Sequence, residues 1–196
     1  MARQQAKEQR PVNHVQHRLN IRLQRNFPGL DGTLNQASQT PQTDRQTTPQ
    51  QLCPYLVVKG AKAAIDFYVQ AFGATVNFSL IDPSDGRVGH AELSFGATRL
   101  FIADEYPDFG AVSPDTLGGS PVKLHLDVPD ADEFVAHALR HGATVLRPVK
   151  LEFYGRRTGL LADPFGYSWF IASQVEEIDP AEMQRRWQAM SEQPNA

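Results

Sequence analysis

One segment of this chain occurs twice, in the same order and at nearly the same spacing. Arg, Gly, Phe and Gly of the longest piece recur at an offset of 70 residues, and two shorter pieces recur at an offset of 69. The pairs are Gly73–Val76 with Gly142–Val145, Arg87–Gly96 with Arg157–Gly166, and Phe101–Ala103 with Phe170–Ala172. Three matching pieces in one order predict two copies of one supersecondary unit, and such units usually build a site where they meet.

Each copy has the pattern of one strand, one helix and three further strands. Apolar residues at helical spacing predict a helix at Ala61–Phe72 that ends at Gly73, and Asp130 can cap a second helix that runs to His141. Asp104–Ser120 is rich in Pro and Gly and is the expected connector. The predicted strands are Leu52–Val58, Thr75–Ile81, Arg87–Phe95, Thr98–Ala103, Pro121–Val128, Thr144–Phe153, Arg157–Ala162 and Tyr167–Ala172.

The chain divides into three parts by composition and pattern. They are a polar tail at 1–50, a two-module domain at 51–175 with modules at 51–106 and 119–175, and a C-terminal helix and tail at 176–196. The last helix, Ala181–Met190, places Met183, Trp187 and Met190 on one face. We expect this apolar face to dock on the domain or on a second copy of the chain.

The first fifty residues differ sharply from the rest. They hold ten Gln and seven Lys or Arg against three Asp or Glu, with few large apolar side chains. Such a segment cannot bury enough apolar surface to offset its ordering entropy, so we expect it to be largely disordered. A dispensable tail or an upstream start codon would explain it. The alternative is a basic amphipathic helix around Val15, Leu19 and Leu23, as in an organelle transit peptide.

Several function classes are disfavoured by composition. The chain has one cysteine, Cys53, which rules out an internal disulfide and makes the cytoplasm the expected compartment. No apolar run is long enough to span a bilayer, and no secretory signal is recognisable. The first fifty residues carry +4, so the remainder is −7 within the overall −3, and this negative balance argues against nucleic acid as the main partner.

Short pieces across residues 52–190 point to one family. They are Pro54-Tyr55-Leu56, Ile65-Asp66-Phe67-Tyr68, Phe72-Gly73-Ala74, Gly89-His90-Ala91-Glu92-Leu93, Ala103-Asp104-Glu105, Gly155-Arg156-Arg157, Asp163-Pro164-Phe165-Gly166-Tyr167-Ser168-Trp169, Glu176-Glu177 and Glu182-Met183-Gln184-Arg185-Arg186. With the tandem repeat, they resemble the vicinal oxygen chelate superfamily (glyoxalase I, bleomycin-resistance proteins, extradiol dioxygenases), and its PhnB-like branch in particular. The resemblance implies an α+β fold in which two tandem βαβββ modules form a curved, open barrel-like sheet around a central cup, with helices outside. It also implies a homodimer, but one fold hosts many reactions.

The resemblance allows a test for a metal site. In metal-using members, each module supplies one ligand from its first strand and one from its last. Carried over by strand position, those places hold Cys53 and Phe101 in the first module and Lys123 and Phe170 in the second. A phenyl ring offers no lone pair to a metal and an ammonium repels one, so we predict no family-type metal and no cofactor.

A relocated divalent metal is the alternative. His90, Glu92 and His125 are ligand types that could lie on one cup. The plainer interpretation is that His90 and Glu92 form a hydrogen-bonded polar pair and that His125 is an ordinary strand histidine.

Strand alternation sorts the side chains onto two faces. The apolar face, expected under the helices, carries Leu56, Val58, Leu100, Ile102, Leu124, Leu126, Trp169 and Ile171. The opposite face carries the predicted ligand-binding residues Tyr55, Arg99, Phe101, Lys123, His125 and Phe170. This set suits a small ligand with a flat or apolar part and an anionic group. His90 and Glu92 are the candidate catalytic acid and base.

Two further residues carry specific expectations. Arg157, equivalent to Arg87 in the repeat, is expected to form a salt bridge with Asp163 and so to brace its loop. Cys53 is expected to be a small buried hydrophobic residue instead of a reactive thiol.

Three functions stay open. The first is a metal-independent small-molecule-binding protein, and the second is a glyoxalase-like enzyme that uses His90 and Glu92, with or without a relocated metal. The third is a structural or dimerisation module that uses the apolar face of the last helix.

Overall fold

The structure is a computed structural model that describes residues 50–192. These residues belong to a compact unit that spans Pro49–Ala196. The predicted polar tail and the helix around Val15 lie outside the described residues, apart from Gln50.

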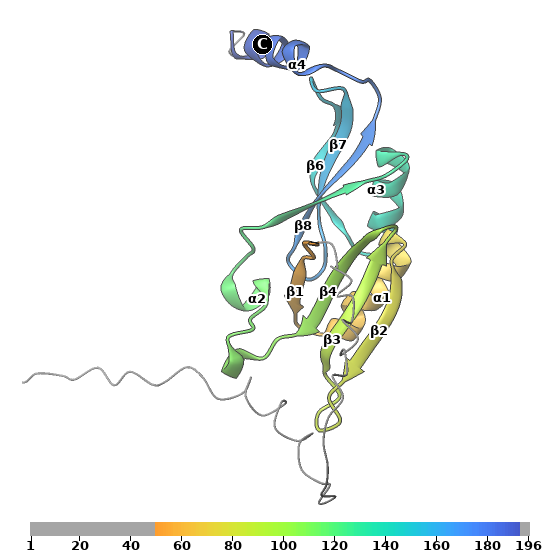
Figure 1. The fold of residues 1–196 in the computed structure, drawn as a ribbon, viewed down its shortest axis with the longest axis vertical. Helices are drawn as coiled ribbons and strands as arrows, with labels where there is room; N and C mark the ends of the chain where they lie inside the picture. The colour runs from red at the N-terminus through yellow and green to blue at the C-terminus, as the bar shows by residue number, and fades with distance from the viewer. Residues whose placement is uncertain (1–49, 193–196) are drawn as a thin grey trace, which may run out of the picture. The chain divides into compact units, whose positions relative to one another are not determined.

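The first module is a four-stranded sheet with one helix (Figure 1). Its elements are β1 (Tyr55–Val58), α1 (Ala61–Phe72), β2 (Thr75–Ile81), β3 (Val88–Phe95) and β4 (Thr98–Asp104). The strands lie in the order β1, β4, β3, β2, with β1 parallel to β4 and the other neighbours antiparallel. Gly60 and Gly73 flank α1 in the left-handed conformation, which explains why the helix has the predicted limits.

The second module repeats this plan. Its elements are β5 (Lys123–Asp127), α3 (Ala131–Arg140), β6 (Thr144–Leu151), β7 (Arg156–Ala162) and β8 (Ser168–Gln174), and the strand order is β5, β8, β7, β6. Asp130 caps α3 as predicted, because its carboxylate accepts from the backbone N–H groups of Asp132 and Glu133.

The predicted α+β fold with two tandem βαβββ modules is confirmed. The eight strands form two separate sheets and no closed barrel, since no hydrogen-bonded ladder joins the two sheets within residues 50–192. Strands β1 and β5 have four and five residues, and each has one partner strand, β4 or β8. The predicted cup therefore consists of two open sheet faces, one on each module.

The connector contains two short helices that the sequence analysis did not predict. They are the 3₁₀ helix η1 (Pro107–Phe109) and α2 (Pro114–Leu117). The many Pro and Gly residues of the connector suggested an irregular loop, but Pro in the first turn also suits a short helix.

The last helix, α4 (Pro180–Ser191), begins where the sequence predicts, after the cap Asp179. The ring of Trp187 packs on Phe153 beside the β6–β7 hairpin, with ring centroids 5.1 Å apart. Trp187 nevertheless stays 53% exposed, so the apolar face of α4 is only partly covered by the domain.

The core lies between the sheets and the helices, as strand alternation predicts. Leu56, Val58, Leu100, Ile102, Trp169 and Ile171 are buried, and Leu124 and Leu126 are partly buried against them. Aromatic rings join the modules, since Trp169 lies 5.0 Å from Phe72 and 5.6 Å from Tyr68, centroid to centroid. Cys53 is only half-buried, so its predicted place in the core is wrong; it precedes β1.

A buried carboxylate also joins the modules. Asp163 accepts hydrogen bonds from the Tyr68 hydroxyl of α1 at 2.6 Å and from Trp169 Nε1 at 2.8 Å. It also accepts from the backbone N–H groups of Phe165 and Tyr167. Burial, together with the nearby negative charge of Asp163, raises the pKa of Tyr68 well above its ordinary value, so this hydroxyl keeps its proton at neutral pH.

The predicted salt bridge between Arg157 and Asp163 is wrong. Arg157 binds Asp132 instead, with Nε and Nη2 at 2.5 and 2.8 Å from its two carboxylate oxygens. Arg157 lies near the start of β7, next to the first turn of α3, whereas Asp163 follows the far end of that strand. The strand length separates the two residues that the sequence analysis paired.

The hydrogen bonds of Glu105 in the connector should make the folded protein less stable at acidic pH. The Glu105 carboxylate accepts from the Ser113 backbone N–H and from the hydroxyls of Thr116 and Ser113, which lowers its pKa from 4.5 to about 2. A lowered folded-state pKa adds stability above pH 4.5, and this stability is lost as pH falls toward 2. Glu105→Gln should therefore lower the melting temperature at pH 7 and flatten its dependence on pH between 4.5 and 2, measured by circular dichroism.

Asp115→Asn is the matched control, because Asp115 lies on the exposed side of α2. An unchanged pH profile in Glu105→Gln would contradict the assigned role of Glu105.

Candidate functional site

The open face of the first sheet, opposite α1, holds most of the predicted site residues. Strand pairing sets Tyr55 of β1 beside Phe101 of β4, Phe101 beside Glu92 of β3, and Glu92 beside Phe78 of β2. Alternation along β3 adds His90 to the same face. Four strands thus contribute to one continuous row of aromatic and polar side chains.

On this face the rings of Tyr55, Phe78 and Phe101 all lie close to the ring of His90. The His90 ring lies 5.5 Å from Tyr55, 5.3 Å from Phe101 and 5.6 Å from Phe78, measured between centroids. The Tyr55 hydroxyl is 3.0 Å from His90 Nδ1. Burial raises the pKa of Tyr55, so its hydroxyl stays protonated and can donate to Nδ1.

Charged groups lie directly beside the rings. Glu92 is 18% exposed, and its two oxygens lie 3.8 Å from His90 Nε2 and 3.5 Å from Arg99 Nη1. The Arg99 guanidinium stands 5.7 Å from the centre of the Phe101 ring and donates to the side chain of Gln51. His90 and Glu92 are therefore neighbours, but at 3.8 Å they do not form the expected hydrogen bond, and Arg99 is a third polar side chain beside them.

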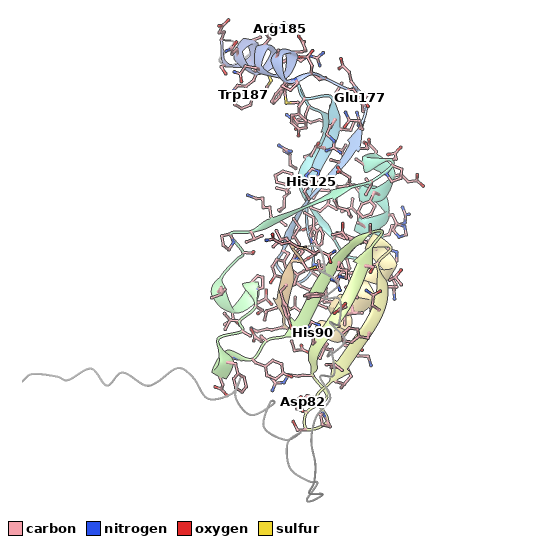
Figure 2. The ribbon with its side chains drawn as sticks, viewed as in Figure 1. Asp82, His90, His125, Glu177, Arg185 and Trp187 are labelled. Atoms are coloured by element: carbon pink, nitrogen blue, oxygen red, sulfur yellow. The ribbon has the colours of Figure 1, made fainter. Side chains whose placement is uncertain are left out.

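The other predicted site residues lie on the second module. His125 of β5 pairs with Phe170 of β8, and their rings are 6.3 Å apart. His125 Nε2 also lies 3.1 Å from Asp127 Oδ1. Lys123 is on the same face, exposed at the start of β5. Figure 2 shows His90 and His125 on different sheets, so the structure groups the predicted residues into two sets.

One cavity is lined by predicted site residues from both modules. It has a volume of about 250 Å³, and its polar lining includes Arg99 from the first module with His125 and Asp127 from the second. Its apolar lining comes from Pro54, Phe95, Leu100, Leu124, Leu126 and Trp169. A small ligand there would meet a guanidinium, an imidazole and a mainly apolar wall.

The predicted metal positions on the last strand of each module lie beside other predicted site residues. Strand pairing sets Tyr55 opposite Phe101 and His125 opposite Phe170. Among residues 50–192, no three His, Cys, Asp or Glu side chains are grouped as metal ligands, so His90, Glu92 and His125 do not converge there. The metal-free character of the protein stays a prediction.

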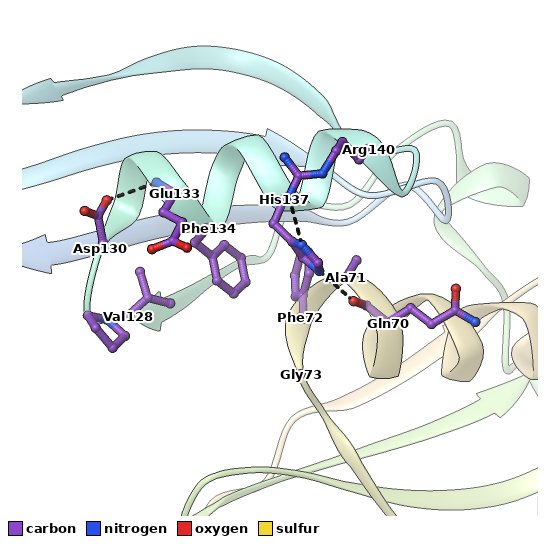
Figure 3. Close-up of a pocket in the computed structure, with 11 residues that line it drawn as sticks. Gln70, Ala71, Phe72, Gly73, Val128, Asp130, Glu133, Phe134, His137 and Arg140 are labelled. Atoms are coloured by element: carbon purple, nitrogen blue, oxygen red, sulfur yellow. Dashed lines mark hydrogen bonds between the residues drawn. The ribbon is translucent and has the colours of Figure 1, made fainter.

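A second groove lies on the helical side, between α1 and α3 (Figure 3). His137 Nε2 is 2.8 Å from the Gln70 carbonyl oxygen, and Arg140 lies 3.2 Å from His137 Nδ1. His137 therefore joins the helices of the two modules. Because both ring nitrogens are engaged, His137 has a structural role.

The sequence analysis missed several polar and aromatic residues of the open faces. These are Phe78 of the first module and Arg147, Glu152, Arg156 and Thr158 of the second. Strands β2 and β6 both contain register shifts, which break the regular alternation used to assign faces. These shifts account for Phe78 and Arg147, whereas Arg156 and Thr158 lie on the regular central strand β7.

Comparison with known proteins decides the family. The sequence model of the Glyoxalase/Bleomycin resistance protein/Dioxygenase superfamily matches residues 49–171. This chain belongs to the glyoxalase/bleomycin resistance/dioxygenase superfamily. An uncharacterised protein of Mycobacterium bovis is 39% identical over 145 residues, which cover 72% of this chain and 93% of that protein.

Two solved structures have a similar fold. The X-ray structure of an Arabidopsis thaliana gene product is 28% identical and has a TM-score of 0.52, covering 63% of this chain and 98% of that one. The crystal structure of a Pseudomonas aeruginosa protein has a TM-score of 0.54 at 24% identity, covering 65% of this chain and 99% of that chain, and supports the fold alone. Among residues 50–192, no helix is long and apolar enough to cross a membrane.

Proposed function

We propose that this superfamily member binds a small molecule on the open face of its first module, without a family-type metal. The observation that supports this is the cluster of Tyr55, His90, Phe101 and Arg99, which sets a guanidinium beside three aromatic rings. A flat ligand can stack on the rings while Arg99 holds its anionic group. The ligand class is therefore a small aromatic acid, and Lys123, His125 and Phe170 would add contacts from the second module.

Benzoate is the simplest probe of this proposal. It should bind the wild-type protein, and Arg99→Met should weaken binding about tenfold, because a charge-assisted hydrogen bond is lost. Titration calorimetry measures both affinities. Lys62→Met, an exposed cation on α1, is the matched control and should bind like the wild type. Equal affinity of Arg99→Met and wild type would contradict the proposal.

Metal content tests the metal-free part. We expect elemental analysis of the purified protein to find no stoichiometric metal. Zn²⁺, Ni²⁺, Mn²⁺ and Fe²⁺ should leave the melting temperature unchanged, because a ligand that binds the folded state raises it by mass action. A near-stoichiometric metal that disappears in His90→Ala would refute this part and favour a relocated site.

An enzyme is the second candidate, supported by the contacts of His90 with both Tyr55 and Glu92. Tyr55 donating to Nδ1 leaves the proton of His90 on Nε2, toward Glu92, which is the arrangement that an acid–base pair needs. Loss of turnover in Glu92→Gln with benzoate binding retained would support catalysis. Unchanged turnover in that variant would refute it.

The assembly and compartment belong to the same proposal. We place this PhnB-like protein in the cytoplasm as a homodimer, and the half-exposed Trp187 on α4 supports a role for that helix in association. Deleting residues 179–196 should convert a dimer to a monomer in light scattering while the circular dichroism spectrum is kept. A structural or dimerisation module with no ligand is the remaining alternative, and it predicts no binding of any small molecule.

A further inference from the structure

The groove between α1 and α3 lies on the helical side of the molecule, away from the open sheet faces (Figure 3). Its volume of about 400 Å³ is in the range of small-molecule sites. The end of α1 supplies one wall, and α3 with the segment before it supplies the other. Because each wall belongs to a different module, a ligand in this groove would contact both modules.

The middle of the groove is apolar. Phe72 of α1 and Phe134 of α3 pack edge to face, with ring centroids 5.2 Å apart. Ala71, Val128 and Pro129 continue this surface, and we call the five residues the apolar wall. Phe72 is buried and Phe134 is half-buried, so the wall offers the edges of rings and not a free ring face for stacking. It suits a hydrocarbon chain better than a flat aromatic ligand.

One end of the groove is acidic. The carboxylates of Asp130 and Glu133 both lie there (Figure 3). Asp130 uses Oδ1 to cap α3, which leaves its second oxygen available. Glu133 is exposed, and within residues 50–192 no cation pairs with it. An ammonium group could bind this acidic end without displacing any protein contact.

Arg140 lies at the other end of the groove. Its Nη1 donates to the Ala136 carbonyl at 3.1 Å, and its Nη2 lies 3.2 Å from His137 Nδ1. These contacts fix the guanidinium beside the groove but use only two of the five N–H donors of an arginine. The side chain is exposed, so the remaining donors can bind a carboxylate.

The spacing along α3 determines the shape of a ligand that uses both ends. Glu133 and Arg140 are seven residues apart on one face of the helix, which is about 10 Å along its axis. An ion pair forms only within about 4 Å, so these two side chains cannot neutralise each other across the groove. Their positions in the first and last turns also suit the dipole of α3, but that role does not require an apolar wall between them.

A linear molecule with a charge at each end matches all of these features. We infer that the groove between α1 and α3 is a binding site for an ω-amino acid, a hydrocarbon chain with an ammonium at one end and a carboxylate at the other. The ammonium lies at the acidic end, the chain lies along the apolar wall, and the carboxylate binds Arg140. This site is separate from the one proposed on the first module.

The probe that tests this inference is 6-aminohexanoate, by titration calorimetry on the full-length protein. It should bind, while hexanoate, which lacks the ammonium, and hexylamine, which lacks the carboxylate, should each bind about tenfold more weakly. Equal affinity for 6-aminohexanoate and either of these compounds would overturn the inference, and so would no binding of 6-aminohexanoate.

Glu133→Gln tests the acidic end. It should weaken 6-aminohexanoate about tenfold, because it removes the charge that holds the ammonium, and leave the affinity for hexanoate unchanged. Asp66→Asn, an exposed acid on α1 outside the groove, is the matched control and should bind 6-aminohexanoate like the wild type. Undiminished affinity of Glu133→Gln for 6-aminohexanoate would overturn the assigned orientation.

Arg140→Met tests the other end. It should weaken both 6-aminohexanoate and hexanoate about tenfold and leave hexylamine unchanged, since only the first two carry a carboxylate. Arg185→Met on exposed α4 is the matched control. Arg99→Met separates this groove from the site on the first module and should bind 6-aminohexanoate like the wild type. Weakening by Arg99→Met equal to that by Arg140→Met would overturn the assignment to the groove, whatever the result with benzoate.

Discussion

Replacing Asp163 with alanine should lower the free energy of unfolding by about 3 to 5 kcal/mol, because several buried donors lose their acceptor together. The Tyr68 hydroxyl and Trp169 Nε1 are both buried, and within residues 50–192 neither donates to any other acceptor. Tyr68 belongs to the first module and Asp163 to the second, so the modules should also lose part of their attachment. Urea unfolding followed by the fluorescence of Trp169 measures the effect.

Asp66→Ala on the exposed face of α1 is the control, and it should change stability by less than about 0.5 kcal/mol. Tyr68→Phe separates the contributions at Asp163, because it removes one donor and keeps the ring in the core. It should cost about 1 kcal/mol, since the carboxylate keeps its three other hydrogen bonds. A loss in Asp163→Ala no larger than in Tyr68→Phe would contradict the central role of this carboxylate.

Gly155→Ala should detach the C-terminal segment from the domain. It should also lower the free energy of unfolding by about 2 to 4 kcal/mol, because it combines backbone strain with a steric clash. Gly155 has φ +77°, and a Cβ there would lie 2.5 Å from the backbone oxygen of Glu176 and 2.8 Å from Ile178 Cδ1. The Gly155 carbonyl also accepts hydrogen bonds from the N–H groups of Val175 and Glu176. The clash displaces the chain that leads to α4.

Trp187 reports on this displacement, because its ring packs on Phe153. We expect a red shift of tryptophan emission and faster trypsin cleavage after Arg185 in Gly155→Ala. Gly96→Ala is the matched control, since Gly96 also has a positive φ of 57° but open space at the Cβ position. This variant should show only the backbone strain, which lowers the free energy of unfolding by about 1 kcal/mol, and α4 should be unaffected. The same emission shift in both variants would contradict a specific clash at Glu176.

Helices α1 and α4 show which features of the fold can be predicted from neighbouring residues in the sequence. α1 and α4 begin and end within one residue of the sequence prediction, because Gly73 and Asp179 act on the few residues beside them. The connector was harder, because the start of α2 is held by Glu105, which accepts from Ser113 and Thr116.

The candidate site was predicted in part. Alternation placed Tyr55, Arg99 and Phe101 on one face with His90 and Glu92, since β1, β3 and β4 are regular where these residues lie. It failed on the edge strands β2 and β6, where register shifts hide Phe78 and Arg147 from a period of two.

The sequence by itself determined the tandem repeat, the order of helices and strands, and the apolar face of each sheet, because these follow from periodicity and from capping by near neighbours. The tertiary structure alone decided that the strands form two sheets and that Arg157 pairs with Asp132 instead of Asp163. It also decided that Asp163 meets Tyr68. The physical reason is the same in each case: partners far apart in the chain are chosen by the geometry of the packed modules, which no local pattern of residues records.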